Sequence, residues 1–357
     1  MVTDLAAALD EQRPTLHAQL QRGSRLLLYL LRSMGTALLS LGQYRCTRAV
    51  EELHALPPRH LATGWAQCLL GRAFYESAQY VRARQAFEEM RALAPARSEG
   101  LEIFSSVLWH LRLSNDLVHL AQSAMAFDRT APQTWCVMAN AASAQRDHAR
   151  ALVYLKRALQ LDPLCVYAHS LRGHELVASS DLDGALEAFR EAVRIDPRCY
   201  NAMYGIGTVF MRQQKFGAAE AHFHRACSIH PTSSPLATYL GLCLSASGKH
   251  QEALAELRRA CALHRGNMQA RFHLAQAHSA LGDYAAARLE LAAVHEASPR
   301  EASVLVELGR VCKRLGAHDE AIGHLNAALE LRPPAALASR VREMLVGGTA
   351  STDESEW

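Results

Sequence analysis

The sequence has little of what marks a secreted, membrane-bound or nucleic-acid-binding protein. Aromatic residues make up 6% of its 357 residues, and the formal net charge is only +3. A charge balance this even does not indicate a nucleic-acid groove or a membrane-binding surface. The apolar run at residues 26–31 ends at Arg32 and is far too short to span a bilayer. Residues 1–25 lack the basic start, apolar run and cleavage site of a signal peptide.

The cysteines also lack the spacing of a disulfide framework or a zinc site. There are nine of them, and no two form a C-x-x-C pair. An odd number without paired spacing favours reduced thiols in the cytosol or nucleus. We therefore expect a protein of the nucleus and cytoplasm, in which most cysteines are core residues.

Motifs of known catalytic sites are missing as well. The sequence contains no Gly-rich phosphate loop, no G-x-S-x-G and no H-E-x-x-H. The nearest approach to a metal-ligand cluster is His222 with His224, or His169 with His174. Residues two apart do not face one way on a helix, so the first pair makes a poor site. The sequence predicts no catalytic residues, no metal and no cofactor.

What the sequence does have is one pattern that recurs every 34 residues. Its clearest marks are five prolines and one substitute: Pro163, Pro197, Pro231, Arg265, Pro299 and Pro333. A small residue precedes each mark by twelve positions: Ala151, Ala185, Ala219, Ala253, Ala287 and Ala321. This period is typical of tetratricopeptide repeats, each of which is two antiparallel helices, A and B. We predict an all-α superhelix of such helix pairs.

Two positions in each repeat indicate how its helices pack. With the proline numbered 32, position 8 of helix A is small, for example Gly173 or Ala139. Position 24 of helix B is large: Leu155, Phe189, Phe223, Leu257, Leu291 and Leu325. Burial of each such side chain is worth about 1.5–3 kcal/mol. Proline then ends helix B, because it has no N–H to donate. Where Arg265 replaces it, we expect Gly266 to end the helix.

The repeat sets the domain organisation. We assign residues 1–29 to an amino-terminal helical segment, 30–335 to about eight or nine repeats, 336–346 to a capping helix and 347–357 to a disordered acidic tail. Residues 98–131 have the right length but lack the expected tight turn and the alanine. We expect a distorted helical pair there that keeps the array in phase.

The inner positions of helix A predict a peptide-binding groove. Positions 2, 5, 9 and 12 project inward in stacked repeats, and here they are largely polar, amide-rich and aromatic. Such a surface suits an extended peptide, with Glu175 as an anion for a guanidinium group. Pro235 is one of these positions but is better read as a helix-starting residue. The alternative is that these side chains merely solvate an inner wall.

Several stretches resemble the carboxy-terminal half of the cell-division-cycle 27 protein family. They are TGWAQCLLGRAFYESAQY from Thr63, SEGLEIFSSVLWHL from Ser98, TWCVMANAASAQRDHARAL from Thr134, GHELVASSDLDGALEAFREAVRIDPRCYNAMYGIGTVF from Gly173 and LGRVCKRLG from Leu308. The resemblance covers nearly the whole chain from about Leu41. Its most telling part is the irregular segment 98–131, because a generic repeat would not contain Leu108-Trp109-His110.

The resemblance implies a non-catalytic scaffold of the anaphase-promoting complex, a ubiquitin ligase of the cell cycle. In that family the carboxy-terminal superhelix captures a C-terminal Ile-Arg dipeptide on coactivators and on the Doc-domain subunit. The matching positions imply this pocket: Asn140, His174, Glu175, Asn201, Tyr204 and Thr208. Expected partners are those tails and the other subunits of the complex, without nucleic acid or membrane.

One departure from the family and one alternative function stay open. Family members have an amino-terminal block of repeats that mediates homodimerisation, and this chain has none. A homodimer remains possible, although the family's usual dimerisation repeats are absent from this sequence. The alternative is a tetratricopeptide adaptor or co-chaperone that binds acidic carboxy termini. It would need inward Lys and Arg in consecutive helices, which only the last repeat has, at Arg310, Lys313 and Arg314.

Overall fold

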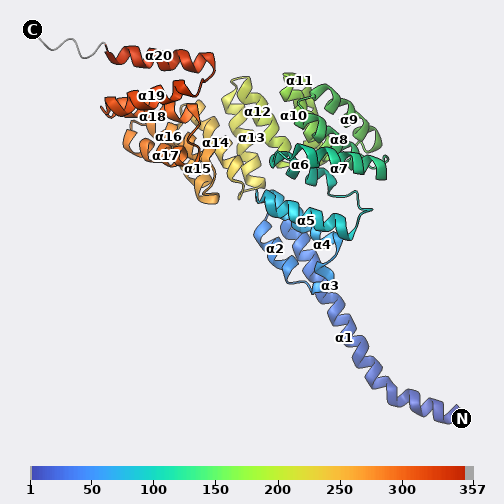
Figure 1. Ribbon diagram of the computed structural model, residues 1–357. Helices are drawn as coiled ribbons and strands as arrows, with labels where there is room; N and C mark the ends of the chain where they lie inside the picture. The colour runs from blue at the N-terminus through green and yellow to red at the C-terminus, as the bar shows by residue number, and fades with distance from the viewer. Residues whose placement is uncertain (1, 350–357) are drawn as a thin grey trace, which may run out of the picture. The chain divides into compact units, whose positions relative to one another are not determined.

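The computed structural model describes the backbone of residues 2–349 and the side-chain surroundings of residues 18–345. Within these residues the secondary structure is entirely helical (Figure 1). The chain divides into two compact units, Met1–Cys199 and Tyr200–Trp357. The first unit holds α1 (Val2–Gly42), α2 (Cys46–His54), α3 (Pro58–Leu61), α4 (Gly64–Glu76), α5 (Tyr80–Leu93), α6 (Leu101–His110), α7 (Ser114–Phe127), α8 (Pro132–Ala144), α9 (His148–Leu161), α10 (Val166–Ala178) and α11 (Leu182–Ile195).

The second unit continues the same succession of helix pairs. Its helices are α12 (Tyr200–Arg212), α13 (Phe216–Ile229), α14 (Ser234–Ala246), α15 (His250–Leu263), α16 (Met268–Ala280), α17 (Tyr284–Ala297), α18 (Ala302–Arg314), α19 (His318–Glu330) and α20 (Ala335–Thr349). In both units each helix A packs on the helix B that follows it. The predicted all-α fold of paired helices is therefore confirmed.

A left-handed residue makes the turn inside each pair. Ser180 has φ 67°, and the next amide, Asp181 N, donates to Leu176 O at 2.9 Å. That bond satisfies a carbonyl in the last turn of helix A. The equivalent residue is glycine only in the later repeats, at Gly248, Gly282 and Gly316. In the earlier repeats it is Tyr44, Ala78, Arg112, Arg146, Ser180 and Gln214, each with φ between 56° and 67°.

Phenylalanine at position 24 packs against glycine at position 8 in this fold. A Cβ added at Gly173 would come within 2.5 Å of the Phe189 ring, which is fully buried. Phenylalanine at position 24 is opposed by glycine in three repeats: Gly71 with Phe87, Gly173 with Phe189, and Gly207 with Phe223. Where position 8 is alanine, position 24 is leucine, as in Ala139 with Leu155. Glycine also faces leucine in two repeats, at Gly241 with Leu257 and at Gly309 with Leu325. Phenylalanine is therefore found only opposite glycine, whereas leucine is found opposite either glycine or alanine.

The segment 98–131 is more regular than the sequence suggests. The expectation that it lacks the tight turn is wrong, because Arg112 has φ 57° and Leu113 N donates to Leu108 O at 3.0 Å. The missing alanine is explained by a swap between two positions of helix B, where the large and the small side chain have changed places. Leu117 is fully buried where other repeats carry alanine, and Ala121 lies where they carry a large residue. What differs is helix A, which is only ten residues long in α6.

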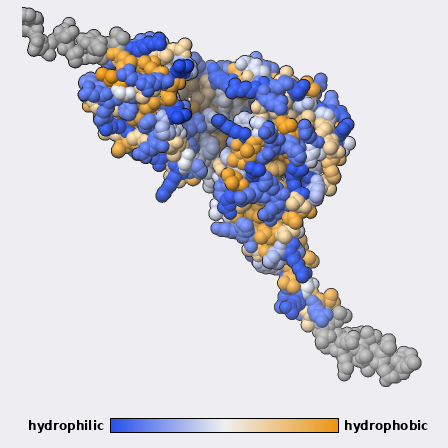
Figure 2. Space-filling view, in the orientation of Figure 1, coloured by the Kyte–Doolittle hydropathy of each residue, from blue (hydrophilic) through white to orange (hydrophobic). Residues whose placement is uncertain are grey.

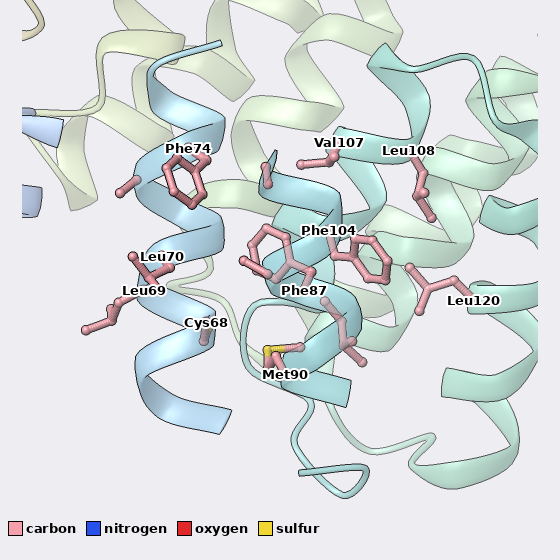
Figure 3. Close-up of a cluster of buried hydrophobic side chains, with 14 of the residues drawn as sticks. Cys68, Leu69, Leu70, Phe74, Phe87, Met90, Phe104, Val107, Leu108 and Leu120 are labelled. Atoms are coloured by element: carbon pink, nitrogen blue, oxygen red, sulfur yellow. The ribbon is translucent and has the colours of Figure 1, made fainter. Parts of the chain in front are cut away.

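Aromatic packing joins this segment to the repeat before it. The rings of Phe87 and Phe104 are stacked with centroids 5.4 Å apart. Figure 3 shows Phe104 lying between Phe87 and Leu120 in the buried cluster. The core therefore passes without a break from α4 and α5 through α6 and α7.

The end of helix B does not depend on the residue at position 32. We expected Gly266 to end α15 in place of proline. This is wrong, because Gly266 is not among the described glycines with positive φ. Instead His264 is extended, with φ −143°, as Asp196 is before Pro197, with φ −128°. Pro235 does start a helix, because it lies in the first turn of α14 after the cap Ser233.

The two ends of the chain are helical where they are described. Ala37 and Leu41 of α1 are buried in the core of the first unit, whereas Leu28, earlier in the same helix, is 66% exposed. Figure 2 shows hydrophobic side chains between hydrophilic ones along this part of α1. At the other end, α20 runs to Thr349, so residues 347–349 of the predicted tail are helical, and residues 350–357 lie outside the described residues. None of the described helices has the length and hydropathy needed to cross a bilayer.

Candidate peptide-binding site

The six predicted pocket residues divide equally between the two units. Asn140 on α8 and His174 and Glu175 on α10 belong to the first unit, whereas Asn201, Tyr204 and Thr208 all lie on α12 in the second. Asn140 and Glu175 are buried, and the other four are half-buried. None projects freely into solvent, so the contacts of each side chain decide what it can offer a ligand.

Asn140 is the centre of a buried polar network in the first unit. Its Nδ2 donates to Ser105 Oγ and to Tyr167 Oη, both at 2.7 Å, and Tyr167 Oη lies 2.6 Å from Ser106 Oγ. Burial raises the pKa of Tyr167, so its phenol is neutral at physiological pH. The amide nitrogen expected to bind a peptide is therefore already bound within the protein.

Glu175 is also partnered. Its Oε2 accepts a hydrogen bond from Nδ1 of His148 at 2.8 Å, and its side chain is 5% exposed whereas that of His148 is 31% exposed. A guanidinium group that reached Glu175 would have to share this carboxylate with His148 or displace it. Sequence reasoning missed His148, because it is the first residue of the preceding helix B and carries no local signal.

His174 is held as a neutral ring. The rings of His174 and Phe189 form an edge-to-face pair, with centroids 4.9 Å apart and planes at 72°. Burial lowers the pKa of His174 to about 4. A neutral imidazole offers one donor and one acceptor and adds no positive charge beside Glu175.

In the second unit Tyr204 belongs to an aromatic cluster. Its ring meets Tyr239 edge-on at 4.8 Å and lies 6.0 Å from Phe223, which also stacks on Tyr239 at 6.2 Å. Burial raises the pKa of Tyr204, so the phenol stays neutral. Tyr239 was not predicted, although its place in the helix A after that of Tyr204 is a signal that could have found it.

The other two residues of the second unit lie on the same helix. Thr208 donates from Oγ1 to Tyr204 O at 3.0 Å, one turn back along α12. Asn201 is half-buried in the first turn of that helix. Together α12 and α14 present an apolar aromatic surface beside one amide and one hydroxyl. Such a surface suits an aliphatic side chain with a polar backbone next to it.

The basic residues of the last repeat are engaged within the protein. Nη2 of Arg310 lies 2.6 Å from Oε2 of Glu307, and Lys313 donates to Met344 O at 3.0 Å. Two of the three side chains named for the alternative function thus have partners. Among the described residues, no three His, Cys, Asp or Glu side chains are grouped to hold a metal ion.

A separate cavity lies elsewhere in the first unit. Its volume is about 310 Å³, and the polar residues of its lining are Arg91, Arg97, Ser98, Ser123, Asp128 and Thr134. None of the six predicted residues lines it. The cavity and the predicted peptide site are therefore different places on the first unit.

Comparison with known proteins identifies the repeat. Family models of the tetratricopeptide repeat match residues 132–163, 170–234, 244–304 and 302–334, together more than half of the chain. Among solved structures, the fold resembles one described as the anaphase-promoting complex hetero-tetramer Cut9-Hcn1. Its TM-score is 0.73 at 16% identity, and the match covers 84% of this chain and 59% of that one.

Curated relatives give the nearer likeness. Cell division cycle protein 27 homolog A of Arabidopsis thaliana is 34% identical over 348 residues, which is 96% of this chain and 48% of that protein. Anaphase-promoting complex subunit 3 of Schizosaccharomyces pombe is 35% identical over 157 residues, 44% of this chain and 24% of that protein. The chain thus spans about half the length of the Arabidopsis thaliana relative, and the match covers about a quarter of the Schizosaccharomyces pombe relative. The chain belongs to the tetratricopeptide-repeat family and, within it, is similar to the cell division cycle 27 proteins.

Proposed function

We propose that this chain is a non-catalytic scaffold subunit of an anaphase-promoting complex. The observation that carries the proposal is the likeness to a cell division cycle 27 protein along 96% of the chain. A relative of similar identity bears the name of a subunit of that complex. The repeat architecture supports a scaffold, because stacked helix pairs offer long surfaces to other proteins. A nuclear and cytoplasmic location belongs to the same proposal.

The proposal includes capture of C-terminal Ile-Arg tails, carried by coactivators and a Doc-domain subunit. In the first unit Glu175 supplies a carboxylate for the arginine, and a charge-assisted bond to a guanidinium is stronger than one between neutral groups. Nδ1 of His148 already donates to this carboxylate, so the arginine of the tail would compete with His148 for it. The neutral His174 beside it adds no repulsion.

The second unit, taken by itself, has groups that suit an aliphatic side chain and a peptide backbone. Tyr204 and Tyr239 offer aromatic faces to an aliphatic side chain. Asn201 offers both a donor and an acceptor to an extended backbone. An amide and aromatic rings together are the usual means by which a groove holds a short peptide.

Purification from cells tests membership of the complex. The full chain, tagged and expressed at a low level, should recover the other subunits of the ligase. A tagged protein of unrelated repeats serves as the control and should recover none. Recovery of chaperones alone would overturn the scaffold proposal and favour the co-chaperone alternative.

Two substitutions test the pocket itself. Asn201→Ala and Tyr204→Ala should each weaken tail binding by about 1–3 kcal/mol if they are central contacts. Phe272→Ala is the matched control, because Phe272 holds the same repeat position as Tyr204 two repeats later and lies outside the pocket. Equal losses in Phe272→Ala and Tyr204→Ala would contradict the assignment.

A further inference from the structure

Two residues that lie 29 apart in the sequence meet repeatedly in this fold. Ser170 Oγ lies 3.4 Å from Cys199 Sγ in the first unit. In the second unit Asn267 Nδ2 donates to Thr238 Oγ1 at 3.1 Å. In each case the first residue holds position 5 of helix A and the second lies just before the next helix A. The repeat geometry therefore brings these two side chains into contact.

Cysteines occupy both of these places in one repeat. Cys136 holds position 5 on α8 and is fully buried, and Cys165 is the residue just before α10 and is half-buried. Cys165 packs against the buried cluster that contains Cys136. The interaction between the two thiols raises the pKa of Cys136 and lowers that of Cys165. In the two other contacts described above, at most one of the two residues is cysteine.

We propose that Cys136 and Cys165 form a redox-active dithiol, which a small disulfide such as oxidised glutathione converts to an intrachain disulfide. The repeat places these two side chains as it places Ser170 and Cys199, whose Oγ and Sγ atoms lie 3.4 Å apart. A disulfide requires the two sulfurs to approach to about 2.05 Å. The bond would join α8 to the start of α10 and enclose α9 in its loop.

The two cysteines have different roles in the exchange. Cys165 is the more exposed of the two residues and holds the N-cap position of α10, where the partial positive charge of the helix end favours a thiolate. This thiolate attacks one sulfur of oxidised glutathione, and a glutathione thiolate leaves. Cys136 then loses its proton and attacks the Cys165 sulfur of the mixed disulfide, and a second glutathione leaves. In total the two cysteines give two electrons and two protons to form two glutathione thiols.

The position of the pair gives the bond a structural consequence. Asn140 lies one turn beyond Cys136 on α8, and Tyr167 lies two residues beyond Cys165. These two residues are hydrogen-bonded at 2.7 Å. A disulfide would therefore fasten the same two helices that the Asn140–Tyr167 bond joins. It forms without a partner protein, whether or not the chain binds Ile-Arg tails.

Mass spectrometry of the folded full chain tests the proposal. The protein is incubated with oxidised glutathione, alkylated to trap free thiols and digested with trypsin. Trypsin separates the two cysteines, because Cys136 falls in residues 130–146 and Cys165 in residues 158–172, with no other cysteine in either peptide. We expect one dominant cross-linked product of these two peptides, lost on treatment with dithiothreitol.

Matched variants decide whether the pair is specific. Cys136→Ser creates the serine–cysteine combination that Ser170 and Cys199 already form, so it should fold and lose the cross-link. Cys199→Ser should leave the cross-link unchanged. Circular dichroism checks that both variants are folded. The proposal is overturned if folded wild-type protein gives no 130–146 to 158–172 product, or if random pairs of cysteines form in equal yield.

Discussion

Nδ1 of His148 lies 2.8 Å from Oε2 of Glu175, and this hydrogen bond joins the first residue of α9 to a buried carboxylate on α10. A buried carboxylate that loses its donor keeps the full cost of its desolvation. The pair therefore has two consequences, one for stability and one for the candidate site.

Removal of His148 should destabilise the first unit. His148→Ala leaves Glu175 without this donor, and we expect a loss of about 1–3 kcal/mol. The midpoint of thermal unfolding measures it. Adding Glu175→Gln should recover part of the loss, because the amide that remains has no charge to bury. A midpoint unchanged in His148→Ala would show that the bond contributes nothing to stability.

The close approach of Gly173 to the Phe189 ring predicts that a second substitution can offset the effect of a first. Gly173→Ala should destabilise by about 1–3 kcal/mol, because its Cβ would overlap the Phe189 ring. Phe189→Leu alone leaves a cavity. The double variant recreates the Ala139–Leu155 pair of the preceding repeat and should be more stable than the sum of the single effects allows. If the two single effects simply added in the double variant, the contact between residues 173 and 189 would not be the cause of either effect.

The burial of His174 predicts a loss of stability in acid. Its pKa is lowered to about 4 in the folded protein, against about 6.5 when unfolded, so the unfolded chain binds more protons between these values. Stability should therefore fall as the pH falls from about 6.5 to 4, by up to about 3 kcal/mol from this residue. His174→Gln should remove that part of the dependence. If the free energy of unfolding depends on pH in the same way in the wild type and in the variant, this prediction is wrong.

Glu102 should have the opposite effect. Burial raises its pKa to about 7, so the folded protein holds a proton that the unfolded chain releases above about 4.5. Its contribution to stability should fall as the pH rises from about 4.5 to 7, by up to about 3 kcal/mol. Glu102→Gln should gain stability over wild type most clearly at pH 8, measured by thermal unfolding. A variant that is less stable than wild type at pH 8 would contradict this.

The sequence predicted the repeat fold well because its determinants are local and periodic. Proline at position 32, small residues at positions 8 and 20 and a large residue at 24 recur every 34 residues, and the structure confirms the helix pairs. The turn in segment 98–131 was missed although Arg112 holds the same left-handed position as Arg146 in the next repeat, and no residue type marks this position in the early repeats. A left-handed non-glycine residue costs roughly 1–2 kcal/mol, and the bond from Leu113 N to Leu108 O helps to offset that cost.

The candidate site was harder to predict because its partners come from other helices. Nothing beside Glu175 in the sequence indicates His148, and nothing beside Asn140 indicates Ser105 or Tyr167. The Cys136–Cys165 contact has a signal, a separation of 29 residues, but this is meaningful only once the repeat geometry is known. The six pocket residues remain a prediction, and the structure gives at least one contact for each of them except Asn201.

Titration of a labelled peptide ending in Ile-Arg tests the central claim most directly. The full chain is titrated against that peptide, the same peptide with an amidated end, and one that ends in alanine, by fluorescence anisotropy. We predict saturable binding of the first, weakened at least tenfold in the other two, about 1.4 kcal/mol or more. Equal binding of all three peptides, or binding of none, would contradict the account.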